Sequence, residues 1–137
     1  MNGSPPIAVL DASALIALIY DEPAAARVAE VLRRGALIST VNWAEVLSDM
    51  AERGEAVDVS APRARSMIEK VGTLDLVPFD EAQSQQSARL RTRTRSLGLS
   101  LADRACLALG RIRRLPVLTT DRAWRSLHPS IKIEVIR

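Results

Sequence analysis

Short apolar runs alternate with longer amphipathic segments along the whole chain, and Gly, Pro or Asp separates most of them. The apolar runs predict strands at residues 7–10, 36–39, 74–78, 116–119 and 131–135. The amphipathic segments predict helices at residues 12–20, 24–34, 41–53, 61–71, 80–97, 100–113 and 122–127. Strands that alternate with helices favour an α/β fold, a three-layer α/β/α sandwich with a parallel sheet of about five strands.

The breaker residues fit this division. Gly35, Gly54 and Gly72 each follow a predicted helix, and Gly98 is expected to cap the long helix at residues 80–97. A chain of 137 residues without internal repeats or a linker corresponds to one domain, here residues 1–137, with a loose tail expected at residues 1–6.

Composition describes the core and gives a first indication of partners. Hydrophobic residues make up 47% of the chain but aromatic residues only 3%, so Ala, Val, Leu and Ile must form the core. The net charge is +3, with 17 arginines and 2 lysines. Arginine pairs with phosphate through two parallel hydrogen bonds, which favours a nucleic-acid partner, although a GC-rich genome also enriches arginine.

Several classes of protein are disfavoured. A single cysteine, Cys106, cannot form an internal disulfide, and it is interpreted as a small core residue in a protein of a reducing compartment. The only histidine, His128, lacks partners for a zinc site. Residues 7–20 lack the basic start of a signal peptide, and no apolar run is long enough to span a membrane. We therefore expect a cytoplasmic location and no membrane contact.

Four acidic residues carry the most information about chemistry: Asp11, Glu45, Asp103 and Asp121. Asp11 and Asp121 each follow an apolar strand, where the carboxyl ends of parallel strands open into a ligand-binding crevice. Each acid could instead cap a helix, and residues 42–45 and 100–103 both resemble capping boxes. Carboxylates that converge need a cation, and hard oxygen ligands select Mg²⁺ or Mn²⁺.

Four segments resemble the motifs of PIN-domain ribonucleases, above all the VapC toxins of bacterial toxin–antitoxin pairs. They occur in the order of that family and nearly span the chain: VLDASAL at residues 9–15, VNWAEV at 41–46, LSLADRACLA at 99–108 and LTTDR at 118–122. The resemblance implies a PIN-like fold and metal-dependent endoribonuclease activity. It also implies the partners: an RNA substrate, a VapB-type antitoxin and a second copy of the chain in a homodimer.

Carried over by position, Asp11, Glu45, Asp103 and Asp121 become the catalytic residues and the ligands of one or two Mg²⁺ or Mn²⁺ ions. The resemblance also places Ser13, Asn42, Thr119 and Arg122 around the site or near substrate. For Ser13 and Thr119, capping and strand-end hydrogen bonds are an equal alternative, and Arg122 is interpreted as forming a surface ion pair. Trp43 is a candidate base-stacking residue or a core residue. The arginines at positions 89, 91, 93 and 95 could contact a polyanion or form a solvated face.

Three alternatives to a ribonuclease can be weighed against the sequence. A phosphatase of the haloacid-dehalogenase type also begins with an Asp after its first strand, but it requires a second Asp where this chain has Ser13. A receiver domain requires an acidic pair at the first strand and a phosphoacceptor Asp that are both missing here. A catalytically silent PIN fold that binds RNA or protein is the non-enzymatic alternative, and the presence of all four acids argues against it.

Overall fold

The structure, a computed structural model, describes residues 4–127 and 130–137. The expectations for His128 and for the first three residues of the tail lie outside the described residues. The described chain forms five strands: β1 (Ala8–Leu10), β2 (Ala36–Ser39), β3 (Leu74–Val77), β4 (Val117–Thr119) and β5 (Ile133–Val135). Six α-helices connect them: α1 (Ala12–Ile19), α2 (Ala25–Arg34), α3 (Thr40–Glu52), α4 (Val57–Val71), α5 (Glu81–Arg93) and α6 (Leu101–Arg113). Two 3₁₀ turns complete the order, η1 (Arg95–Leu97) and η2 (Arg122–Ser126).

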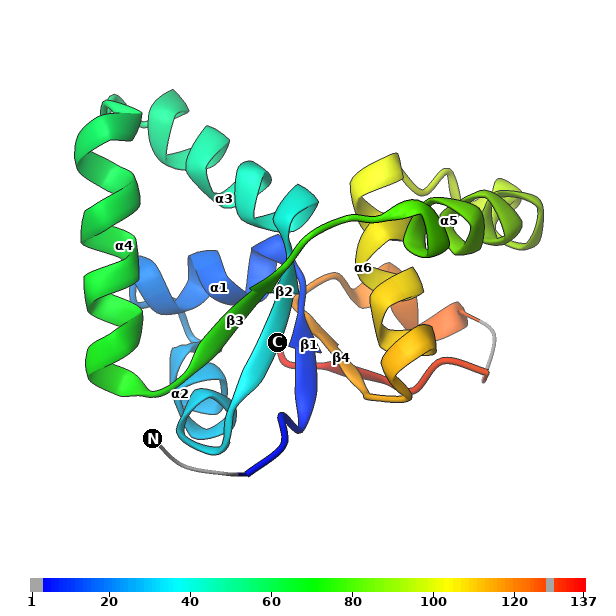
Figure 1. The fold of residues 1–137 in the computed structure, drawn as a ribbon, viewed down its shortest axis with the longest axis horizontal. Coiled ribbons are helices and arrows are strands. Elements are labelled where there is room, and N and C mark those ends of the chain that lie inside the picture. Colours follow the sequence, from blue (N-terminus) through cyan, green and yellow to red (C-terminus); the bar gives the residue numbers. More distant parts are fainter. Residues whose placement is uncertain (1–3, 128–129) are drawn as a thin grey trace.

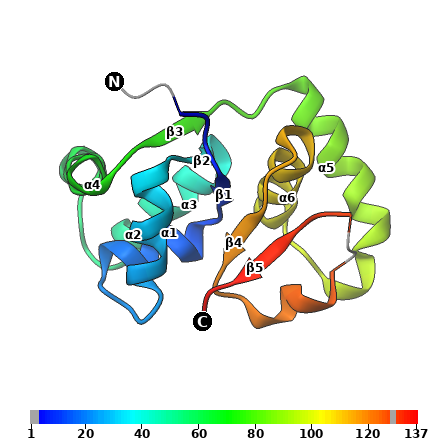
Figure 2. The same cartoon turned by 90° about the horizontal axis from the view of Figure 1, so that it is seen from below.

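All strand pairs are parallel, and the sheet has the order β3-β2-β1-β4-β5 (Figure 1, with β5 labelled in Figure 2). The chain therefore moves from β1 outward to β2 and β3, and then crosses back to add β4 and β5 on the other side of β1. This reversal places a topological switch point between β1 and β4, which is where ligands bind in open parallel sheets. The prediction of a parallel α/β sandwich with five strands is confirmed.

Helices cover both faces of the sheet, with α1 to α4 on one side and α5 and α6 on the other (Figure 2). Successive side chains of a strand point to opposite faces of the sheet, so a strand can contribute side chains to the hydrophobic core on each face. Ala8 and Leu10 pack with α1 to α4, whereas Val9 packs with Leu107 and Leu109 of α6. The three central strands, β1, β2 and β4, are buried on both faces and are therefore apolar at almost every position. The edge strands β3 and β5 are partly exposed and carry Asp75 and Glu134.

Three element boundaries differ from the sequence prediction by more than one residue. Helix α4 begins at Val57 rather than at residue 61, so Pro62 lies inside the helix. The long helix predicted at residues 80–97 ends at Arg93, because the Thr94 hydroxyl donates to the Leu90 carbonyl at 2.7 Å and the chain turns into η1. Gly98 therefore caps η1, with φ 61°. The last strand is Ile133–Val135, shorter than the predicted 131–135.

Ala, Val and Leu are plentiful between residues 12 and 32, which could suggest an apolar groove on the first two helices, but the structure does not expose the Val and Leu side chains. Apolar side chains between residues 12 and 32, such as Leu15, Val28 and Leu32, are buried in the core because α1 and α2 pack against the sheet and against each other. The large apolar side chains that are exposed in the described part of the chain lie elsewhere: Val57, Val59, Leu97, Leu101 and Ile112. Across the same part, every helix is too short or too polar to cross a membrane.

Candidate active site

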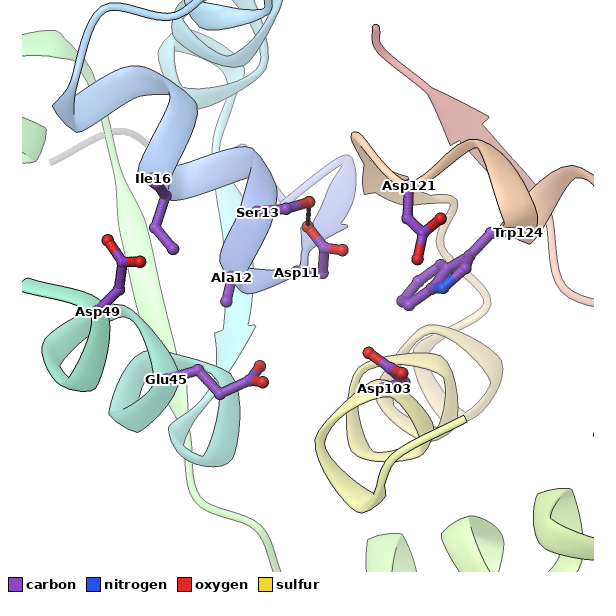
Figure 3. A pocket seen from close by; sticks show the side chains of 9 residues that line it. All are labelled: Asp11, Ala12, Ser13, Ile16, Glu45, Asp49, Asp103, Asp121 and Trp124. Atoms are coloured by element: carbon purple, nitrogen blue, oxygen red, sulfur yellow. Dashed lines mark hydrogen bonds between the residues drawn. The ribbon is translucent and has the colours of Figure 1, made fainter. Parts of the chain in front are cut away.

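The four acids reach one place from four separate elements. Asp11 follows β1 and Asp121 follows the neighbouring strand β4, so both lie at the switch point of the sheet. Glu45 lies on α3, which begins directly after β2, and Asp103 lies in the first turn of α6. All four line one cavity of about 310 Å³, which is shown in Figure 3. The other residues that line it are Ala12, Ser13, Ile16, Asp49 and Trp124.

Asp11 is the most buried acid of the cavity and is held by three donors. Its Oδ1 accepts from the Ser13 hydroxyl at 2.7 Å and from the Ala14 N–H at 2.9 Å, and its Oδ2 accepts from the Thr119 hydroxyl at 2.5 Å. Ser13 and Thr119 are fixed in turn, since their oxygens accept from the N–H groups of Thr120 and Asp121 at 3.0 Å. This network joins the ends of β1 and β4 and orients the Asp11 carboxylate toward the cavity.

Burial raises the pKa of Asp11 from 3.8 to about 6. The hydroxyls of Thr119 and Ser13 and the N–H of Ala14 lower this pKa, and the negative charge of Asp103 raises it. Burial also raises the pKa of Glu45, the Asn42 amide lowers it, and the charge of Asp103 raises it. Asp103 therefore acts electrostatically on two acids from other elements, and an ionised site carries mutual repulsion that a cation would relieve.

Asn42 links the helices that carry Glu45 and Asp103. Its side-chain N–H group donates to Glu45 Oε1 at 3.1 Å and to the Ala102 carbonyl at 2.9 Å. The alternative interpretation of residues 42–45 as a capping box does not apply, because Ser39 caps α3 by accepting from the Val41 N–H. Asn42 instead lies within the first turn, buried at the contact between α3 and α6.

Asp103 and Asp121 each cap a helix and also line the cavity. Asp103 forms a capping box with Ser100: its Oδ2 accepts from the Ser100 N–H at 3.0 Å, and the Ser100 hydroxyl accepts from the Asp103 N–H. Asp121 caps η2 through Oδ1, which accepts from the Ala123 N–H at 3.0 Å. Each cap uses one carboxylate oxygen and fixes the side chain, so the second oxygen stays free to contact a ligand.

The cavity also contains two residues, Asp49 and Trp124, that lie outside the set indicated by the family resemblance. Asp49 lies one helical turn after Glu45, an i,i+4 relation that could have indicated it, and it forms an ion pair with Arg53 at 2.8 Å. Trp124 lines the cavity, and its indole nitrogen is buried without a hydrogen-bond partner among the described residues. No sequence signal distinguished Trp124 from Trp43, which is part of the core beside α1 to α4.

Two further expectations can be compared with the structure. Cys106 is a buried free thiol, as expected, and burial together with the nearby acids raises its pKa well above its ordinary value, so it stays protonated. The surface ion pair expected for Arg122 is wrong: within residues 4–127 and 130–137, Arg122 is exposed and forms none.

The acids that line the cavity suit a hard divalent cation. Four carboxylates from the predicted set meet there without a histidine or cysteine ligand, and oxygen donors of this kind prefer Mg²⁺ or Mn²⁺ over softer metals. Among the described residues, no three His, Cys, Asp or Glu side chains already form a closed metal-binding group. The carboxylates thus lie around a cavity large enough for cation, water and phosphate together.

The fold of this chain has counterparts among solved structures. Among solved structures, the chain resembles a DNA-bound VapBC from Salmonella typhimurium, with TM-score 0.72, 17% identity, and 95% of this chain and 98% of that chain covered. VapBC-5 from Mycobacterium tuberculosis is 26% identical, with TM-score 0.59 and coverage of 97% and 99%. A toxin–antitoxin complex from Klebsiella pneumoniae is 21% identical, with TM-score 0.67 and coverage of 90% and 94%.

The structures from Salmonella typhimurium and Klebsiella pneumoniae are 17% and 21% identical to this chain, so their similarity shows a shared fold. No curated protein sequence matches the chain. The PIN domain family, in contrast, matches residues 8–128, which include all four acids and nearly the whole sheet. The parallel sheet, the acids at its switch point and this match lead to one conclusion: the chain belongs to the PIN domain family.

Proposed function

We propose that this protein is a metal-dependent endoribonuclease and the toxin of a VapBC-type toxin–antitoxin pair. The observation that carries the proposal is the convergence of Asp11, Glu45, Asp103 and Asp121 in one cavity at the switch point of a PIN fold. A phosphatase of the haloacid-dehalogenase type is disfavoured, because Ser13 occupies the place of its second acid and hydrogen-bonds to Asp11.

In this proposal Asp11 and Asp103 are the direct ligands of Mg²⁺ or Mn²⁺, and Glu45 and Asp121 contribute directly or through water. When bound, such a cation lowers the pKa of water and neutralises charge on phosphoryl oxygens. Ser13 and Thr119 keep the Asp11 carboxylate fixed, and Asn42 does the same for Glu45. Ser13, Thr119 and Asn42 are therefore positioning residues, and Arg122, exposed on η2 beside Asp121, is free to approach a phosphate.

The reaction is an in-line hydrolysis of an RNA phosphodiester. A water oxygen attacks phosphorus while the bond from phosphorus to the 3′-oxygen breaks, and the leaving oxygen takes a proton. The products carry a 5′-phosphate and a 3′-hydroxyl. Glu45 is suited to accept the proton of the attacking water, since its pKa is raised by burial and by the charge of Asp103.

Incubation with total cellular RNA tests this function. We expect cleavage with Mg²⁺ or Mn²⁺ and none with EDTA, and the fragments should accept a label only after their 5′-phosphate is removed. Asp103→Asn should lose cleavage, and p-nitrophenyl phosphate should not be hydrolysed. Hydrolysis of this phosphomonoester without RNA cleavage would support a phosphatase, and RNA binding without any cleavage would support a silent PIN module.

The antitoxin partner and the cytoplasmic location are part of the same proposal. The similar solved structures include complexes named VapBC and toxin–antitoxin, some of them bound to DNA. Four carboxylates in one cavity offer an inhibitor a simple chemistry, because an inserted arginine can satisfy them in place of a metal. An apolar helix that covers the entrance is the second possible strategy.

We expect expression of the chain alone to stop growth and co-expression with a small neighbouring reading frame to restore it. The two proteins should purify together, and the complex should cleave RNA at least about tenfold more slowly because the carboxylates are occupied. Asp103→Asn is the control that should be harmless without the partner. Harmless expression of an active chain, with no protein co-purified from its neighbouring frames, would contradict the toxin assignment.

A further inference from the structure

The two helical layers carry opposite charge. Residues 81–114, which carry α5, η1 and α6, contain eight arginines and two acids, Glu81 and Asp103. Residues 12–71, which carry α1 to α4, contain nine acids and seven basic residues. Because the layers lie on opposite faces of the sheet, one side of the molecule is basic and the other acidic (Figure 2). The acidic cavity lies where the two layers meet.

The arginines of the basic layer are not neutralised within the chain. Every ion pair among the described residues uses Arg27, Arg53, Arg63 or Arg65, all of which belong to the acidic side. On the basic layer, the arginines at positions 89, 91, 93 and 95 are all exposed. Arginines at i,i+4 spacing repel each other, so this arrangement costs stability unless an anion contacts them.

A small cavity of about 90 Å³ lies where α5 ends. It is lined by Arg91, Thr94, Arg95, Gly98 and Leu99. The turn that shapes it is defined by the Thr94 hydroxyl, which bonds to Leu90, and by the left-handed conformation of Gly98. The negative end of the α5 dipole favours Arg91 in the last turn, but it does not account for Arg95, which lies beyond the helix.

This cavity is close to the acids along the chain. Leu99 leads directly into the capping box of Ser100 and Asp103. Five residues from Gly98 to Asp103 can span at most about 18 Å. With a rise of about 3.4 Å per stacked nucleotide, this distance corresponds to five nucleotides or fewer.

We propose that Arg91 and Arg95 form a phosphate subsite that holds the RNA backbone within about five nucleotides of the acidic cavity. The strand then enters over the α5–α6 layer, and the acidic side of the molecule repels it. This inference rests on the proposed ribonuclease function. The residues recognise backbone phosphate, so the subsite contributes affinity and direction but no base specificity.

The test measures binding of a random-sequence, single-stranded 12-nucleotide RNA in EDTA, so that no cleavage occurs. We expect Arg91→Ala/Arg95→Ala to weaken binding about tenfold and to reduce the slope of log Kd against log salt by roughly 1.4, the loss of two phosphate contacts. The matched control is Arg33→Ala/Arg34→Ala at the end of α2. It removes the same charge from two exposed arginines on the acidic side and should leave affinity and slope unchanged.

The outcomes separate this inference from the proposed function. If the unchanged protein cleaves RNA but both double variants bind RNA as tightly as the unchanged protein does, the phosphate subsite is wrong and the ribonuclease proposal stands. If the unchanged protein neither binds nor cleaves RNA, the proposed function fails first. If polyglutamate of equal charge displaces the RNA more effectively than unlabelled RNA does, the basic face is a site for an acidic protein segment. All four arginines are exposed, so both double variants should melt at the temperature of the unchanged protein.

Discussion

Asp11→Asn is expected to abolish RNA cleavage and, at neutral pH without metal, to make the protein more stable. Activity should fall at least about a hundredfold, because the variant loses the charge of a carboxylate placed to bind the metal. The fold should persist, since an asparagine can accept from Ser13 and Ala14 through Oδ1 and can donate to Thr119 through its amide nitrogen.

The stability gain follows from the pKa of Asp11. Burial raises this pKa from 3.8 to about 6 in the folded protein, so the folded state binds the proton more tightly than the unfolded state does. The contribution of protonated Asp11 to the free energy of unfolding is therefore fully present below pH 3.8, and it is lost as the pH rises through about 6. Above that pH, ionised Asp11 lowers the free energy of unfolding by at most about 3 kcal/mol. A neutral asparagine at this position does not have this cost.

Urea unfolding in EDTA at several pH values between 4 and 8 measures this effect. The difference in free energy of unfolding between Asp11→Asn and the unchanged protein should be near zero at pH 4 and greatest at pH 7 to 8. Asp75→Asn removes the same charge from an exposed position on β3 and should change neither activity nor stability. Millimolar Mn²⁺ should stabilise the unchanged protein but not Asp11→Asn, because only the former has the complete site. The stability advantage of Asp11→Asn over the unchanged protein should grow from pH 4 to pH 7. An advantage that shrinks over this range would contradict this account.

The sequence allowed the site to be predicted where chemistry and topology coincide. Asp11 and Asp121 could be placed together because both follow apolar strands, and the parallel sheet aligns the ends of those strands. Glu45 and Asp103 required the family resemblance, because a position on a helix does not indicate which cavity the side chain meets. All four line the same cavity. Their roles as ligands stay a prediction that the activity assays address.

Other features depended on contacts that no local pattern reveals. Asn42 has the sequence appearance of a helix cap, but its partner Ala102 is sixty residues away, so its link between α3 and α6 is a tertiary feature. Trp43 and Trp124 are equivalent by type, and only the packing of α3 and η2 decides which one reaches the cavity. The early end of α5 likewise depends on one Thr94 hydroxyl that bonds to the backbone of Leu90.

A close backbone contact at Gly72 is expected to make this position intolerant of any side chain. Gly72 follows α4 and lies against the end of α2. A Cβ at this position would lie 2.1 Å from the carbonyl oxygen of Leu32 and 2.7 Å from the backbone nitrogen of Arg33. The same Leu32 oxygen accepts from the Thr73 N–H at 2.9 Å, a bond that sets the chain on its path into β3. Backbone atoms cannot rotate away as a side chain would, so a Cβ must displace α2 from α4.

Gly72→Ala should therefore reduce the free energy of unfolding by about 2–4 kcal/mol, which combines overpacking with the loss of one backbone hydrogen bond. Gly98→Ala is the informative control, because it has open space around its Cβ and a left-handed φ of 61° that alone costs about 1 kcal/mol. Urea unfolding of both variants measures the difference. Gly72 precedes β3 and so lies at the opposite end of the parallel strands from Asp11 and Asp121. The folded fraction of Gly72→Ala should therefore cleave RNA at the normal rate per folded molecule. Equal destabilisation of the two variants would mean that backbone freedom, rather than the contact with Leu32, is what Gly72 provides.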